Sequence, residues 1–146
     1  MRETEEMEDK YLTMSKLEVA EHQLNAAIRM FLDERDFVCA ITLAGAAEEI
    51  LGKLLEKQGR QHSVAEFAEA CVKVGRHLFN ENWTTKHFVE MQNFFRNGLK
   101  HLTDGEPITV PPAAAEEIIG RAVDNLWALE GRETPEVRRY MESRGW

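Results

Sequence analysis

Residues 15–34 read SKLEVAEHQLNAAIRMFLDE, and this stretch decides the fold class. Ser15 and Glu18 have the spacing of a capping box, in which two side chains bond free backbone N–H groups at the start of a helix. Apolar residues then recur every three or four positions, at Leu17, Ala20, Leu24, Ala27 or Ile28, and Phe31. This period predicts an amphipathic helix over about residues 15–34, with one face buried against other helices.

Similar helix start and stop signals follow along the chain. Arg35-Asp36 interrupts the first helix, and Asp36 is a natural N-cap for a second helix over about 37–58 that stops at Gly59. Ser63-x-x-Glu66 is a second capping box, and it opens a third helix that ends before a turn at 80–82. Further helices are predicted over about 84–101, 113–129 and 135–144, with a long loop over 103–112.

These helices define the predicted architecture. We find no alternating run of β-branched residues beyond Pro107–Val110, so no strand is predicted. Short connections between long helices favour antiparallel neighbours. We therefore predict an all-α, up-and-down helical bundle of four core helices with one or two short accessory helices.

Composition limits the class of protein. A chain of 146 residues, 43% apolar and 30% charged, is typical of one globular domain, which we place at 13–146 after a frayed acidic terminus at 1–12. Two cysteines are too few for a disulfide framework, and the first ten residues hold no apolar secretory core. No apolar run approaches the about 20 residues that span a bilayer. We expect a cytoplasmic protein without a membrane partner.

Charge is distributed unevenly. The net charge is −8, which argues against a general nucleic-acid coat. Residues 71–101 nevertheless hold five bases and two acids, together with three histidines. This segment is either an ordinary fluctuation balanced by acidic neighbours in space or a local site for an anion such as phosphate.

The end of the predicted fourth helix reads FFRNGLKH, residues 94–101. On an ideal helix Arg96 and His101 diverge by about 140°, whereas Arg96 and Lys100 are one turn apart. Arg96 and His101 could meet on one phosphate only if the helix loosens at Gly98 or a second chain contributes. Gly98 costs roughly 1 kcal/mol relative to alanine, which a close approach or a distortion would explain.

Arg96-Asn97-x-x-x-His101 resembles the R-x(4–6)-H motif of HEPN domains, including the polar residue directly after the arginine. Those domains are helical bundles with the motif on a late core helix. The resemblance implies a metal-independent RNA endonuclease of the toxin or of the defence and stress-effector type, with its site at a homodimer cleft. Some members carry a tyrosine two residues after the histidine, where this chain has Thr103.

The resemblance gives each motif residue a role that its chemistry can fill. His101 would act as general base or acid, and Arg96 would offer a planar fork of donors to the phosphorane oxygens. Asn97 would orient phosphate or histidine, and Lys100 would add positive field beside the catalytic residues. Taken singly, His101 is equally typical of a helix C-terminus and Arg96 of a surface ion pair.

Glu48 is the acidic residue that stands out on the second helix. It projects at the margin of the apolar sector, where a carboxylate needs a partner. HEPN domains often carry an acid facing the motif, so the resemblance predicts that Glu48 braces Arg96. The alternative is a rim glutamate that reaches solvent.

Two other functions stay open. One is a non-catalytic, HEPN-like helical module that binds a partner protein or a nucleotide, and the other is an unrelated bundle used for oligomerisation. RNA, an antitoxin or another protein, and a second copy are the partners that the leading hypothesis implies. No cofactor is predicted, and no metal, because His87-x-x-Glu90 lacks the second pair that a bundle metal site requires.

Overall fold

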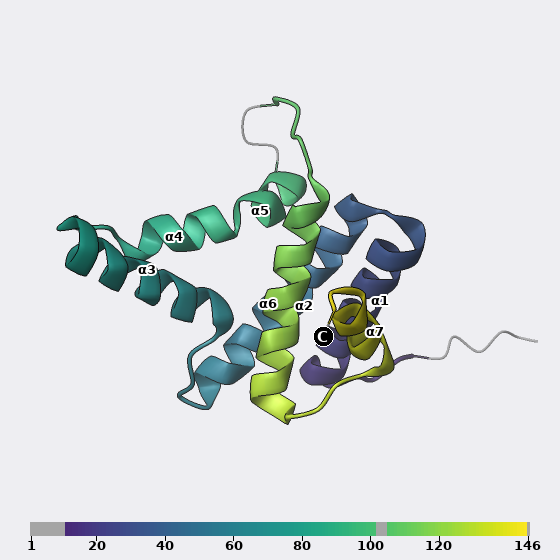
Figure 1. Cartoon of the computed structure of the whole chain (residues 1–146). Coiled ribbons are helices and arrows are strands. Elements are labelled where there is room, and N and C mark those ends of the chain that lie inside the picture. The colour runs from purple at the N-terminus through teal and green to yellow at the C-terminus, as the bar shows by residue number, and fades with distance from the viewer. Residues whose placement is uncertain (1–10, 102–104, 146) are drawn as a thin grey trace, which may run out of the picture.

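The chain folds as an all-α helical bundle, as predicted (Figure 1). The computed structural model describes residues 11–101 and 105–145, and no strand lies within those ranges. Its helices are α1 (Lys16–Arg29), continued by a π-helical turn (Met30–Glu34), α2 (Phe37–Lys57), α3 (Ser63–Phe79), α4 (Thr85–Gln92), α5 (Phe94–Lys100), α6 (Pro112–Glu130) and α7 (Pro135–Ser143). The predicted frayed segment 1–12 falls largely outside the described residues.

Side-chain caps set most helix starts where the sequence predicts them. Ser15 accepts a hydrogen bond from the Glu18 N–H at 3.1 Å, and Asp36 accepts one from the Cys39 N–H at 3.0 Å. For α3 the predicted cap is wrong by one residue. The cap is His62, whose Nδ1 accepts from the Ala65 N–H at 3.2 Å, because its extended backbone places the ring over the first turn.

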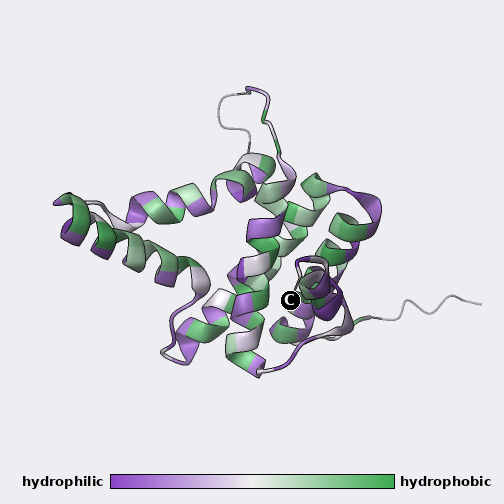
Figure 2. Ribbon diagram, in the orientation of Figure 1, coloured by the Kyte–Doolittle hydropathy of each residue, from purple (hydrophilic) through white to green (hydrophobic). Residues whose placement is uncertain are grey.

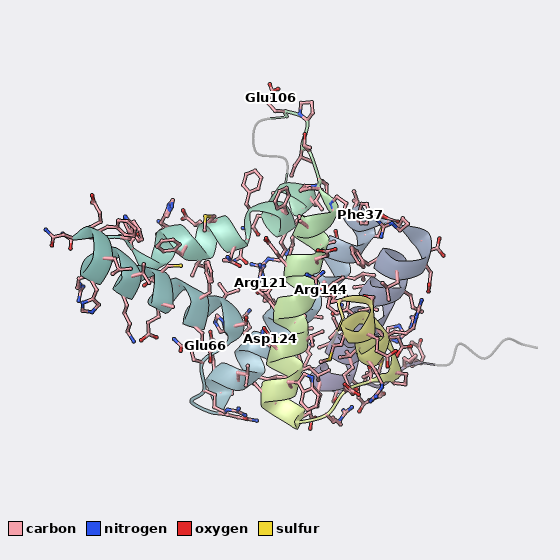
Figure 3. All side chains as sticks on the ribbon, in the orientation of Figure 1. Phe37, Glu66, Glu106, Arg121, Asp124 and Arg144 are labelled. Carbon is pink, nitrogen blue, oxygen red and sulfur yellow. The ribbon has the colours of Figure 1, made fainter. Side chains whose placement is uncertain are left out.

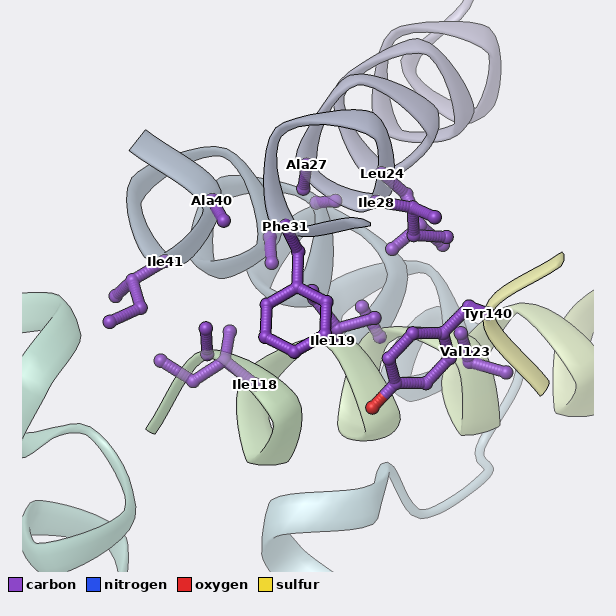
Figure 4. Packing of buried hydrophobic residues seen from close by; sticks show 14 of the residues in the cluster. Leu24, Ala27, Ile28, Phe31, Ala40, Ile41, Ile118, Ile119, Val123 and Tyr140 are labelled. Atoms are coloured by element: carbon purple, nitrogen blue, oxygen red, sulfur yellow. The ribbon is translucent and has the colours of Figure 1, made fainter. Parts of the chain in front are cut away.

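The core lies between α1, α2, α6 and α7. Alanines at every third or fourth position of α2 (Ala40, Ala44 and Ala47) are fully buried, and such small side chains allow close approach of the neighbouring helices. Phe31 and Tyr140 close one end of this core, with ring centroids 6.2 Å apart (Figure 4). The apolar period of the fifth predicted helix, at Ile118, Ile119, Ala122, Leu126 and Leu129, faces this core. The first four of these residues are buried, and Leu129 is partly buried against the same cluster.

The middle of the chain leaves this core. In Figure 1, α3 and α4 extend together to one side of the bundle, and we call these two helices the arm. The helix predicted over 84–101 is divided at Asn93 into α4 and α5, and neither piece has a fully buried residue. Phe95 and Leu99 of α5 still pack against the core cluster, so α5 attaches the arm to the bundle.

Candidate functional site

The motif residues lie on α5 and directly after it. Arg96, Asn97 and Lys100 occupy the short helix, and His101 is its C-cap with extended backbone angles (φ −125°, ψ 138°). The His101 N–H donates to the Asn97 carbonyl at 2.9 Å, and both side chains are exposed. The backbone therefore departs from an ideal helix on both sides of the motif, at Asn93 and at His101.

Gly98 does not carry the predicted loosening, since it lies within α5. A Cβ built on Gly98 would stand 2.7 Å from Cδ1 of Ile108 in the following loop. The glycine is therefore explained by close approach, and the loop after the motif is the neighbour.

Arg96 lies across α2 at Gly45, which has no side chain. A Cβ at Gly45 would stand 2.6 Å from Cγ and 2.7 Å from Cδ of Arg96. The absence of a Gly45 side chain thus allows the half-buried arginine stem to pack on the α2 backbone. Among the described residues Arg96 makes no hydrogen bond or ion pair, so its guanidinium donors are available.

A small cavity of about 180 Å³ opens beside Arg96. Glu48 and Glu49 of α2 and His62 line it with Arg96. The pKa of Glu49 is lowered, first by its bond to Lys53 and then by the fields of Arg96 and Lys100. The positive charges of Arg96 and Lys100 are therefore felt at the same face of α2, where Glu49 and Lys53 are exposed.

Glu48 is buried, with 4% of its surface exposed, and its partner is Arg121 of α6. The Arg121 Nε and Nη2 donate to the two carboxylate oxygens at 3.3 and 3.2 Å. Arg96, the partner predicted from the sequence, lines the same cavity, but no bond joins it to Glu48 among the described residues. Arg121 takes that role because α2 and α6 pack against each other, which brings Arg121 on α6 (labelled in Figure 3) to the buried carboxylate on α2.

Arg121 also reaches α4. Its Nη1 donates to the Gln92 side-chain oxygen at 2.7 Å, and its Nη2 donates to the Gln92 carbonyl at 2.9 Å. Gln92 is the last residue of α4, immediately before the break at Asn93. Glu48 therefore supports α5 indirectly. It binds Arg121, and Arg121 holds the carbonyl of Gln92, two residues before α5 begins.

Arg121 is the site residue that sequence reasoning missed. A signal for it exists, since Arg121 stands three positions after Ile118 and four before Asn125, on the buried side of α6. A charged residue in such a stripe requires a buried partner.

The described residues, 11–101 and 105–145, contain no group of three side chains that could hold a metal ion. Over the same ranges no helix has the length and apolar character that crossing a bilayer requires. Comparisons of this chain with models of protein families, with curated proteins and with solved structures found no match.

Proposed function

We propose that this chain is a HEPN-like, metal-independent RNA endonuclease of the cytoplasm, of the toxin or of the defence and stress-effector type. Arg96, Asn97 and His101 would be its catalytic residues. The observation that carries the proposal is the Arg96 side chain. Its stem packs on Gly45, and its guanidinium makes no bond within the described residues, one helical turn before Lys100 and five residues before the exposed His101.

The reaction needs only groups that these residues supply. His101 would take the proton of the RNA 2′-hydroxyl or give one to the leaving 5′-oxygen. Arg96 would bind two phosphate oxygens through its fork of N–H groups and stabilise the charge that develops on them. Asn97 would hold the phosphate or the imidazole, and Lys100 would raise the local positive potential.

A second copy would complete the site. One α5 presents a single histidine after a seven-residue helix, and the acid and the base of RNA cleavage act on opposite sides of the phosphorus. Two motifs facing across a two-fold axis would supply both groups, as the HEPN resemblance implies.

The test is cleavage of mixed RNA by the purified protein in the presence of a chelator. We expect His101→Ala and Arg96→Ala each to lower the cleavage rate about 10²–10⁴-fold, as for loss of an acid–base group or of phosphorane stabilisation. Circular dichroism should be unchanged, because neither side chain belongs to the core cluster. His22→Ala, which removes an exposed imidazole from α1, is the matched control and should cut normally.

Absence of cleavage by the wild-type protein, together with harmless overexpression, would overturn the nuclease. Binding of a nucleotide or an acidic peptide that requires Arg96 and Lys100 would then identify the chain as a binding module.

A further inference from the structure

Helix α3 carries an apolar row that the rest of the chain covers only in part. Phe67, Val74 and Leu78 are 43%, 43% and 74% exposed, and Cys71 is half-buried between them. Their spacing of four, three and four residues is the heptad spacing of positions that pack against another helix. We call these four residues the α3 seam; the apolar character of this helix is visible in Figure 2.

The fully buried residues of α3 form a neighbouring row. Val64, Ala68 and Gly75 are the buried residues of the helix. A Cβ at Gly75 would stand 2.3 Å from the Trp83 ring, so Trp83 packs directly on the backbone there. The α3 seam lies next to this buried row, and its Phe67 also contacts the arm, with its ring centroid 6.4 Å from that of Phe88 on α4.

Charge along α3 is divided between its two halves. Glu66 and Glu69 stand in the first half, and Lys73, Arg76 and His77 stand in the second. A parallel pair of such helices would place like charges together, whereas an antiparallel pair would place each acidic half beside a basic half. The residue types beside the seam therefore favour a second α3 running in the opposite direction.

We propose that the α3 seam is an interface between two copies of this chain, with the two α3 helices antiparallel about a two-fold axis. The axis passes between residues 72 and 73, so that Leu78 of each copy meets Phe67 of the other and Cys71 meets Val74. Such a pairing is self-complementary, as a two-fold interface requires.

The surroundings of Phe67 suit the C-terminal half of α3 from a second copy. Phe67 and Trp127 line an open cleft of about 510 Å³ between α3, α6 and α7. Asp124 lies on the same cleft, and burial, followed by the field of nearby Glu66, raises the pKa of its carboxyl (Figure 3). The second copy would bring Leu78 to this apolar floor and the positive charge of Arg76 to the two carboxylates.

This interface does not depend on RNA cleavage, although the proposed function also requires two copies. Sedimentation of the full chain at tens of micromolar should show twice 16.8 kDa. Val74→Asp places a carboxylate in the middle of the seam, and we expect it to weaken the dimer about tenfold or more while leaving the helical circular dichroism intact. Val38→Asp changes an equally exposed valine on α2, 49% exposed, and should leave the dimer unchanged.

Cross-linking tests the direction of the two helices. In a chain with Cys39→Ser and Cys71→Ser, the double variant Phe67→Cys/Leu78→Cys should form a covalent dimer on oxidation. Each single variant should stay uncrosslinked, because the antiparallel register separates the two copies of either residue by roughly 16 Å along the axis. A disulfide needs Cα atoms within about 7 Å.

A monomeric wild-type protein would overturn this inference, as would cross-linking of the single variants or a Val74→Asp dimer of normal strength. A dimer that shows all the expected effects but cuts no RNA would keep the interface and refute only the proposed nuclease.

Discussion

At the scale of single residues, the pairing of Glu48 with Arg121 connects the core to the candidate site. Both side chains are almost fully buried, and three of the bonds that Arg121 makes in this group are side chain to side chain. A buried pair of this kind adds little net stability relative to apolar residues, but breaking it leaves an uncompensated charge. Its value here is the fixed position that it gives to Gln92.

Arg121→Met should therefore destabilise the protein by about 3–5 kcal/mol in urea unfolding, because the Glu48 carboxylate loses its partner. The double variant Glu48→Met/Arg121→Met should recover most of that loss, since neither charge remains. If the double variant regains stability but still cuts RNA more slowly than the wild-type protein, the pair positions the motif in addition to stabilising the bundle. Normal cleavage in the double variant would contradict that role.

Tyr140 gives the protein a specific response to alkaline pH. Burial raises the pKa of Tyr140 to about 12, and its hydroxyl donates to the Glu116 carbonyl at 2.9 Å. The unfolded chain ionises this phenol near its ordinary pKa of about 10 while the folded chain keeps it neutral. Stability should thus be full below about pH 10 and fall as the pH rises towards 12. Tyr140→Phe should remove this part of the loss of stability. The check is the free energy of unfolding of both proteins, measured between about pH 10 and pH 12.

At the scale of elements, the contact of α5 with α2 positions the motif. Gly45→Ala gains roughly 1 kcal/mol of helix propensity but forces the Arg96 stem to move, an overpacking that costs about 1–3 kcal/mol. The variant should fold with unchanged or slightly lower stability and cut RNA more slowly.

Gly120→Ala is the control for this prediction. Nothing lies within 4 Å of a Cβ at Gly120 on α6, so that variant should gain up to about 1 kcal/mol and cleave normally. Equal cleavage by the two variants would show that the position of Arg96 over Gly45 does not matter for catalysis.

At the scale of the whole molecule, the bundle has a well-buried part and a thinly packed part. The core cluster comes from α1, α2, α6 and α7, whereas α4 and α5 contribute no buried residue and α3 contributes only small ones and Val64. Regions with few buried apolar contacts open at lower free energy than the core.

Hydrogen exchange should show this division. Amides of α4 and α5 should exchange well before those of α2 and α6. Protection of α3 should rise with protein concentration, because the proposed pairing of two arms adds contacts to that helix. Uniform exchange along the chain, independent of concentration, would contradict both expectations.

The sequence by itself determined the local features. Capping residues and apolar periods placed α2, α6 and α7 within one or two residues, since each signal acts over one or two helical turns. The first predicted helix corresponds to α1 together with the π-helical turn that continues it to Glu34. The signals at Ser15 and Asp36 are of this kind, and the structure confirms both caps. The motif at 96–101 was equally visible, because its residues are close in the chain.

Only the tertiary structure decided what lies across from these features. The partner of Glu48 is 73 positions away in the chain. The place of Arg121 in the apolar stripe of α6 indicates that it needs a buried partner, but not which residue of another helix that partner is. The sequence predicted the α3 helix, yet an apolar period reports only that a face is apolar and not which surface covers it. Because α1, α2, α6 and α7 already fill the core, the α3 seam remains exposed in a single copy.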